Sequence, residues 1–242
     1  MIQFFKNVRR NLLAEGESGK YLKYAIGETL LVMIGILLAL QVNNWNEQRK
    51  SKRIENALLT ELHKSVEEDI ESIKMVIEQN QRYISSAETV LNTIENNSLF
   101  HDSIANHLND GFKVWRVYIR TVAYDNLKEY GLQVIKNDQT RKEIIRAYSG
   151  RTRFVEELYD RYDQFIYNVV EPILADQMEL REVEGYGNIL FPIKGVDFDE
   201  NKLNYLLKKS ISLKDQIIRA KKRTLNSFEK LHEQLQSEIH DL

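Results

Sequence analysis

One carboxylate of this 242-residue sequence lies within a long apolar run, where burying a charge costs free energy. Glu28 is the single charged residue in an apolar run that extends from Tyr24 to Val42. If the run crosses a membrane, this carboxylate could carry a proton or an ion. Alternatively, Glu28 lies close enough to the end of the run to reach the lipid headgroups or to pair with Lys20 or Lys23. Both interpretations stay open.

A second group of side chains could bind a partner or an anionic ligand. The segment from 113 to 120 alternates imperfectly between apolar and polar residues, and it contains an aromatic and basic cluster: Trp115, Arg116, Tyr118 and Arg120. Arginine and large aromatic side chains often dominate the binding energy of protein interfaces. The same residues also fit a structural role, with the aromatic rings in a core and the guanidinium groups outside.

Other polar residues do not predict catalysis. His101 and His107 lie near Asp102, but their spacing fits no established metal-ligand pattern. Asp125 and Lys128 are better explained as a helix cap and a solvated charge. The sequence has no phosphate-binding glycine loop, nucleophile elbow or HExxH motif. We therefore expect a protein that is not an enzyme and that uses no cofactor, metal or small-molecule substrate.

Composition narrows the class further. The 34 basic and 36 acidic side chains nearly balance, so charge does not favour nucleic acid as a partner. The absence of cysteine excludes disulfides and thiolate metal sites. Only Pro172 and Pro192 interrupt the chain, which permits long helices nearly everywhere.

The apolar run itself predicts a membrane anchor. Its roughly 19 residues, at about 1.5 Å per residue, match the ~30 Å hydrocarbon core of a bilayer. Tyr21, Tyr24 and Trp45 bracket it, as interfacial aromatic residues do. A cleaved signal peptide is not favoured, because the run begins late and no A-x-A-like site follows it. We assign residues 20–45 as a transmembrane helix in contact with the lipid bilayer.

Small and amide side chains of this anchor predict contacts between helices. Gly27, Gly35 and Ala39 share one helix face, a pattern that permits close approach of transmembrane helices. Amides adjoin the aromatic anchor at the exit from the run: Gln41, Asn43, Asn44 and Trp45. These amides can hydrogen-bond between copies or to solvated headgroups. We expect the protein to associate with itself or with another membrane protein.

Basic residues near the anchor predict its orientation. Five precede it and four follow it closely, which favours a cytoplasmic N-terminus by a narrow margin. Residues 1–19 predict an amphipathic surface helix whose basic face suits the anionic cytoplasmic leaflet. Residues 46–242 are accordingly expected on the periplasmic side.

The remainder of the chain predicts an all-α domain. Apolar residues recur every three or four positions over about 46–95, 137–185 and 212–239. We expect three long helices in an antiparallel bundle, the first continuous with the anchor through Asn43–Glu47. A capping-box pattern at Ser212–Asp215 predicts the start of the last helix.

Two segments interrupt the helical pattern. Residues 97–137 predict short helices at about 104–109 and 122–130, joined by a link at 113–120 that is either a short strand or irregular. Residues 183–200 predict a connection with an extended piece at 188–193. Because the two segments flank one long helix, we expect the first at the tip of the bundle and the second near its base.

Two motifs resemble those of a known family. Tyr24-Ala25-Ile26-Gly27-Glu28, followed by the stretch from Ile34 to Glu47 (IGILLALQVNNWNE), resembles the opening of a large, uncharacterised family of single-pass membrane proteins from Bacteroidota. The stretch TVAYDNLK at 121–128, followed by Gly131 and by IKN at 135–137, is similar too. Glu129 and Tyr130 depart from the small residues expected before the glycine. The resemblance implies a bacterial inner-membrane location and no activity.

Three classes of function fit these observations. The first is a non-catalytic, membrane-anchored helical scaffold that presents a periplasmic domain to partners. The second is an accessory subunit of an ion- or proton-driven membrane complex that uses Glu28. The third is a ligand-sensing helical bundle, which is disfavoured because only about 23 residues precede the anchor.

Overall fold

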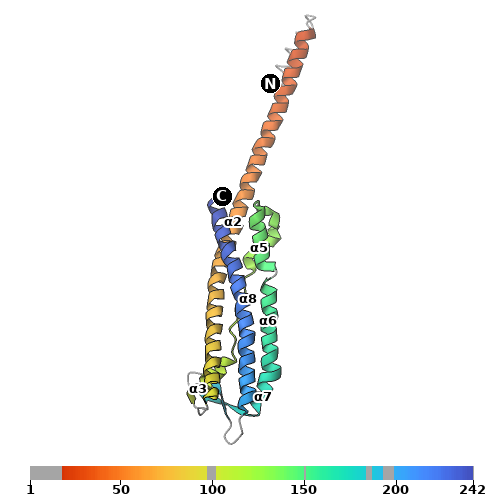
Figure 1. Ribbon diagram of the computed structural model, residues 1–242. Helices are drawn as coiled ribbons and strands as arrows, with labels where there is room; N and C mark the ends of the chain where they lie inside the picture. Colours follow the sequence, from red (N-terminus) through yellow and green to blue (C-terminus); the bar gives the residue numbers. More distant parts are fainter. Residues whose placement is uncertain (1–17, 97–101, 150, 184–186, 193–198, 242) are drawn as a thin grey trace. The chain divides into compact units, whose positions relative to one another are not determined.

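A computed structural model describes residues 18–96, 102–149, 151–183, 187–192 and 199–241, drawn as ribbons in Figure 1. The chain divides into two compact units, Met1–Ile54 and Glu55–Leu242. Helix α2 (Ser18–Glu95) begins in the first unit and ends in the second, so the predicted helical continuity through Asn43–Glu47 is confirmed. The surface helix predicted at 1–19 lies, except for its last two residues, outside the described part.

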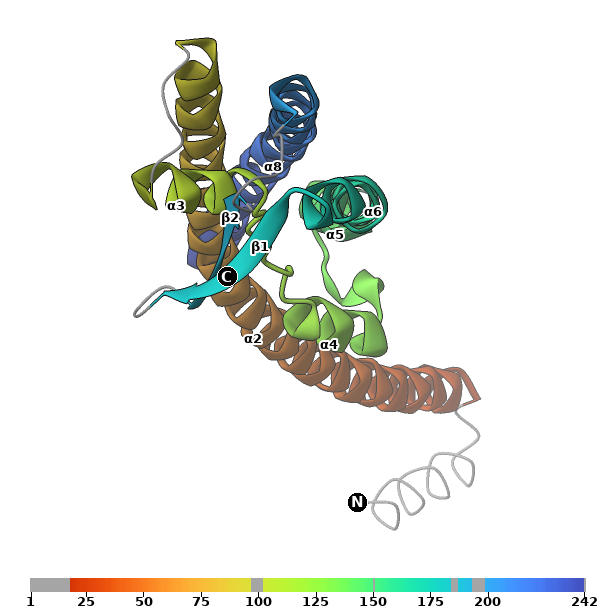
Figure 2. The same ribbon diagram turned by 90° about the horizontal axis from the view of Figure 1, so that it is seen from below.

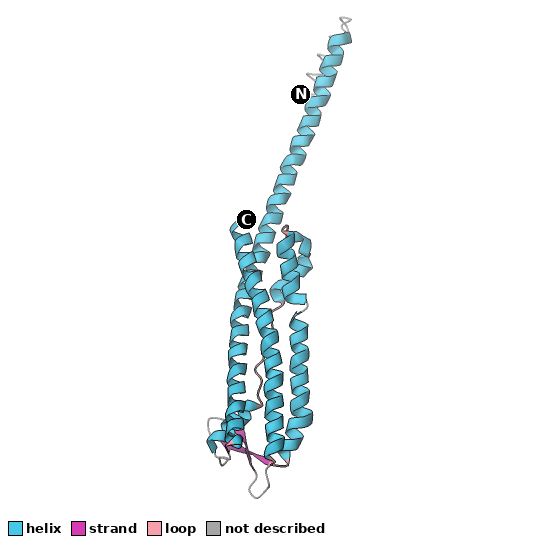
Figure 3. Cartoon of the chain, in the orientation of Figure 1, coloured by secondary structure: helices cyan, strands magenta, loops and turns pink. Residues whose placement is uncertain are grey.

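The described part of the second unit is helical apart from one hairpin and its connecting segments, in agreement with the all-α prediction (Figure 3). Its helices after α2 are α3 (Asp102–Gly111), α4 (Val122–Tyr130), the 3₁₀ helix η1 (Leu132–Val134), α5 (Asp138–Ser149), α6 (Arg151–Phe165), the π-helix η2 (Ile166–Val170), α7 (Glu171–Ala175) and α8 (Glu200–Asp241). Strands β1 (Met178–Val183) and β2 (Gly187–Pro192) pair antiparallel, with Leu180 opposite Leu190. The extended piece expected at 188–193 is therefore β2, while β1 falls in a segment that we expected to be helical.

The long helices pack on α8 through their apolar stripes. Helix α8 runs antiparallel to α2, and both α5 and α6 lie against it (Figures 1 and 2). Two apolar clusters result, one at each end of the unit. The first includes Leu158, Leu206 and Ile217; the second includes Leu62 and Phe228.

The connections run differently from our expectation. Residues 112–121, here called the strap, form neither helix nor strand and return along α2, so Trp115 lies beside Asn80 and Arg120 beside Asp69. The chain therefore enters α5 running in the same direction as α2. The 97–137 segment spans the bundle rather than capping its tip. Strand β2 packs against α3, so the second connection lies at the α3 end and not at the opposite one.

Helix α8 begins twelve residues before the predicted capping box. The carboxylate of Asp199 accepts the backbone N–H of Lys202 at 3.0 Å, which caps the first turn. Leu203, Leu206 and Leu207 extend the buried stripe toward this end. Tertiary packing thus lengthens the helix past the local signal at Ser212.

Two stacked imidazoles join α2 to α8 inside the second apolar cluster. The rings of His63 and His232 lie with their centroids 4.3 Å apart, and Nε2 of His63 is buried without a hydrogen bond from any described residue. Burial lowers the pKa of His63 from 6.5, the proximity of His232 lowers it further, and Glu67 on the same helix acts in the opposite direction.

This pair predicts that the second unit is less stable in mild acid. The folded state binds the His63 proton less readily than the unfolded chain, so stability is complete above pH 6.5 and falls as the pH falls below it. The midpoint of urea unfolding, followed by circular dichroism, should decrease from pH 7.5 to pH 5.5. His63→Gln should reduce that decrease, whereas His107→Gln should not; equal decreases in both variants would contradict the assignment.

Candidate functional site

The first candidate site is the apolar part of α2. Its most apolar 18-residue window has a mean hydropathy of 2.1 and no buried residue. By length and composition this helix could cross a membrane, a test that a core helix or an N-terminal signal sequence also passes. Large apolar side chains remain exposed on every face, as the successive residues Leu31, Val32 and Met33 illustrate.

The predicted contact residues lie on this exposed surface. A Cβ atom added to Gly27 or Gly35 would meet nothing within 4 Å among the described residues, so both positions leave a shallow groove that a second helix could enter. Ala39 lies one turn beyond Gly35. Glu28 is half-buried, unlike most residues around it.

The exit of the run has the predicted amide and aromatic character. Gln41, Asn43 and Asn44 are exposed on α2. The guanidinium of Arg49 lies 5.9 Å from the centre of the Trp45 ring, a cation–π arrangement one turn along the helix. These side chains are therefore exposed on α2 and are open to contact with headgroups or a partner.

The glycine face predicts a measurable association. Gly35→Leu fills the groove and should weaken contact between copies, or with a partner helix, by steric exclusion. The mass of the particle in mild detergent, determined by light scattering, should fall relative to the parent protein. Ile36→Leu, a swap on a neighbouring face, is the matched control. A parent protein that is already a monomer without a bound partner would refute the prediction.

The second candidate site is the strap, which lies within the second unit between α2, α6 and α8. Asn80 forms two hydrogen bonds with Trp115 in the middle of the strap. Its Oδ1 accepts the backbone N–H of Trp115 at 2.9 Å, and its Nδ2 donates to the backbone carbonyl of Trp115 at 2.8 Å. Tyr159 of α6 donates its hydroxyl to that carbonyl at 3.2 Å. The side-chain amide of Asn80 thus satisfies the backbone N–H and C=O groups that a neighbouring strand would satisfy in a sheet.

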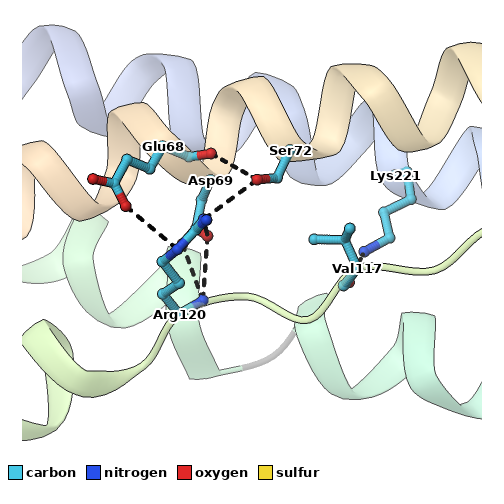
Figure 4. Close-up of polar contacts among 6 residues, drawn as sticks. All are labelled: Glu68, Asp69, Ser72, Val117, Arg120 and Lys221. Carbon is cyan, nitrogen blue, oxygen red and sulfur yellow. Dashed lines mark hydrogen bonds and ion pairs between the residues drawn. The ribbon is translucent and has the colours of Figure 1, made fainter.

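A buried carboxylate fixes the end of the strap. Asp69 has no exposed surface, and its oxygens accept the backbone N–H of Arg120 at 3.2 Å and its Nη1 at 2.9 Å (Figure 4). Glu68 and Ser72 contact the same guanidinium. Burial raises the pKa of Asp69, while the hydrogen bonds from Arg120 lower it.

Two buried lysines of α8 hold the other side. Lys214 donates Nζ to the carbonyl of Gly111 at 2.6 Å, just before the strap, and Ser210 donates to the same oxygen at 2.8 Å. Lys221 donates to the carbonyl of Val117 at 3.2 Å (Figure 4). Burial lowers the pKa of Lys214 to about 7 and also lowers that of Lys221.

The strap gives the four residues of the predicted aromatic and basic cluster different surroundings, although Tyr118 interacts with Arg116. Arg116 forms an ion pair with Asp163, with Nη2 at 2.7 and 2.8 Å from the two oxygens, and its guanidinium covers the Tyr159 ring. Trp115 and Tyr118, in contrast, are 49% and 67% exposed. The buried rings of the structural alternative are therefore wrong. Both arginines hold the fold through ion pairs, and both aromatic rings are exposed.

The remaining polar candidates have few polar neighbours. Asp125 lies in the first turn of α4, whose N-cap is Thr121, so the predicted cap is wrong; its carboxylate pairs with Lys128 at 3.2 Å on the surface. His107 lies 3.4 Å from the hydroxyl of Ser86. His101 lies outside the described residues. Within the part that the structure describes, no three His, Cys, Asp or Glu residues gather as metal ligands would.

Sequence reasoning missed the residues that hold the strap, Asp69, Asn80, Lys214 and Lys221. A signal for two of them exists, because Lys214 and Lys221 lie seven residues apart on the apolar face of α8.

Comparisons of this chain with protein families, curated proteins and solved structures give no match.

Lys214 predicts a rise in stability with pH. The folded state binds fewer protons between pH 7 and the ordinary lysine pKa of 10.5, so stability increases across that window by at most about 1.4 kcal/mol per pH unit. Lys214→Met should flatten the increase in unfolding free energy measured in urea from pH 7.5 to pH 9. The exposed Lys208→Met serves as control. An unchanged slope in Lys214→Met would show that another group titrates.

Proposed function

We propose that this protein is a non-catalytic, membrane-anchored helical scaffold that presents its second unit to protein partners. The observation that carries the proposal is the apolar stretch of α2, of which no residue in the most apolar window is buried. A surface of this length and hydropathy is stable in lipid and unfavourable in water.

The use of the buried ionisable groups supports a structural role. Asp69, Lys214 and Lys221 each bind backbone atoms of the strap or of the residue before it. Catalytic acids and bases instead face a cleft that substrate can enter. The fold explains Asp69 and Lys214, while Lys221 both holds the strap and lines a pocket of about 210 Å³ with Tyr118 and Glu156.

The proposed location is the bacterial inner membrane, with a cytoplasmic N-terminus and a periplasmic second unit. The charge count around the anchor and the resemblance to single-pass proteins of Bacteroidota support it. Contact with a partner would use the glycine face of the anchor and the exposed rings of Trp115 and Tyr118.

A cysteine-free chain permits a direct test of location and orientation. The protein should resist alkaline carbonate extraction from bacterial membranes, and the double variant Ile34→Arg, Leu37→Arg should be released, because two charges in the span oppose insertion. Leu180→Arg, at an exposed position of β1, should stay in the membrane.

Single cysteines then report the side of the membrane. In intact cells an impermeant maleimide should label Lys209→Cys, on the exposed face of α8, and should label Gln3→Cys only after permeabilisation. The reverse pattern would refute the orientation while leaving the anchor intact. Release of the parent protein by carbonate would refute the anchor itself.

A further inference from the structure

A cleft of about 530 Å³ opens at the α3 end of the second unit. Its lining comes from the end of α3, the start of the strap, the π-helix η2, α7 and both strands of the hairpin. Such a volume lies in the range of small-ligand sites, which are mostly apolar with a few polar groups.

The wall of the cleft contains a π-helical turn. Pro172 has no N–H and its ring opposes regular α-helical bonding to the preceding turn, and the chain widens there, so that Glu171 donates its N–H to Ile166 five residues back. The widened turn places Ile166 and Val170 along the cleft. Single π-turns occur frequently at functional sites, because they displace side chains from the regular helical face.

The cleft is apolar at its floor. Val170, Leu174 and Met178 line it and are each at least nine-tenths buried, and Phe112 and Leu190 close its sides. An occupant with an apolar body would therefore displace water from surface that gains by burial.

The rim selects the charge of an occupant. It carries Asn109, Lys113 and Glu171. Lys113 pairs with Asp110, whose carboxylate lies 2.9 Å from its Nζ. Glu171 forms no ion pair with any residue that the structure describes. Among the described residues, the rim thus presents one carboxylate without an ion-pair partner, together with the Asn109 amide, which can donate or accept hydrogen bonds.

We propose that this cleft binds a small organic amine with an apolar aromatic or alkyl body. The body fills the space above Val170 and Leu174, and the ammonium group pairs with Glu171. An organic anion would bring like charges together at Glu171, and a neutral analogue would forgo the ion pair. The cleft lies wholly within Glu55–Leu242, so the proposal is independent of the membrane anchor.

The test compares three ligands that differ only in their polar group. The full chain in lipid nanodiscs is titrated with 2-naphthylmethylamine, 2-naphthylmethanol and 2-naphthoate, with empty nanodiscs as the blank, and binding is followed by calorimetry. The amine should bind saturably, with at least fivefold higher affinity than the alcohol, and the naphthoate should bind weakest.

Variants locate the binding. Glu171→Gln should reduce the affinity for the amine at least fivefold and remove its advantage over the alcohol, whereas Lys113→Gln should not weaken it. Val170→Trp should fill the cleft and abolish binding. Ala175→Trp at the exposed edge gives a second obstruction that does not disturb the floor, and unfolding midpoints verify that both variants fold.

Three results would overturn the proposal. These are no saturable binding of the amine above the blank, naphthoate binding as tightly as the amine, or Glu171→Gln binding like the parent. A monomeric, carbonate-extractable protein that still binds the amine would refute the scaffold proposal and leave this one standing.

Discussion

The second unit depends on one constraint, which is that an extended backbone inside a helical bundle must find hydrogen-bond partners. The strap has no neighbouring strand, and an unpaired buried N–H or C=O group costs roughly 1–3 kcal/mol. Side chains from three helices supply the partners: Asp69 and Asn80 of α2, Tyr159 of α6 and Lys221 of α8. Each donor or acceptor serves one position of the strap, so the register of the strap relative to the helices is fixed by polar contacts.

The direction of the strap determines the rest of the architecture. Because the strap returns along α2, α5 and α6 must run in the direction of α2, and the chain needs a second return, which is α8. The turns from α2 into the strap and from α7 into α8 therefore lie at the α3 end, where β2 packs against α3, and the turn from the strap into α5 lies at the opposite end, beside Glu55. Four elements therefore meet at the α3 end, namely α3, the strap, the π-turn and the hairpin. They do not fill the space between them, and the cleft results.

What the sequence predicts follows from periodicity. The unbroken three-four spacing gave α2 to its end near Glu95, and the glycine after Tyr130 gave the end of α4, where Gly131 has a φ of 92°. The strap was not predictable in this way, because its partners are distant in sequence and its own pattern fits either a poor strand or a loop. Strand β1 was missed for a related reason: Met178 and Leu180 extend an apolar pattern that the preceding helix shares, and only pairing with β2 decides the outcome.

Burying two lysines and an aspartate is an expensive way to hold a connection. Apolar residues of similar volume would pack at lower desolvation cost, but they could not bind a carbonyl or an N–H at a single position. The buried charges instead fix the position of the strap along α8. Lys214 and Lys221 lie seven residues apart on α8, and they donate to the carbonyls of Gly111 and Val117, which lie six residues apart. Seven helical residues rise roughly 10 Å and six residues of a strand roughly 20 Å, a difference that the irregular backbone and the long lysine side chains together make up. Lys214 thus holds the backbone just before the strap and Lys221 holds its middle, while Asp69 of α2 fixes its end.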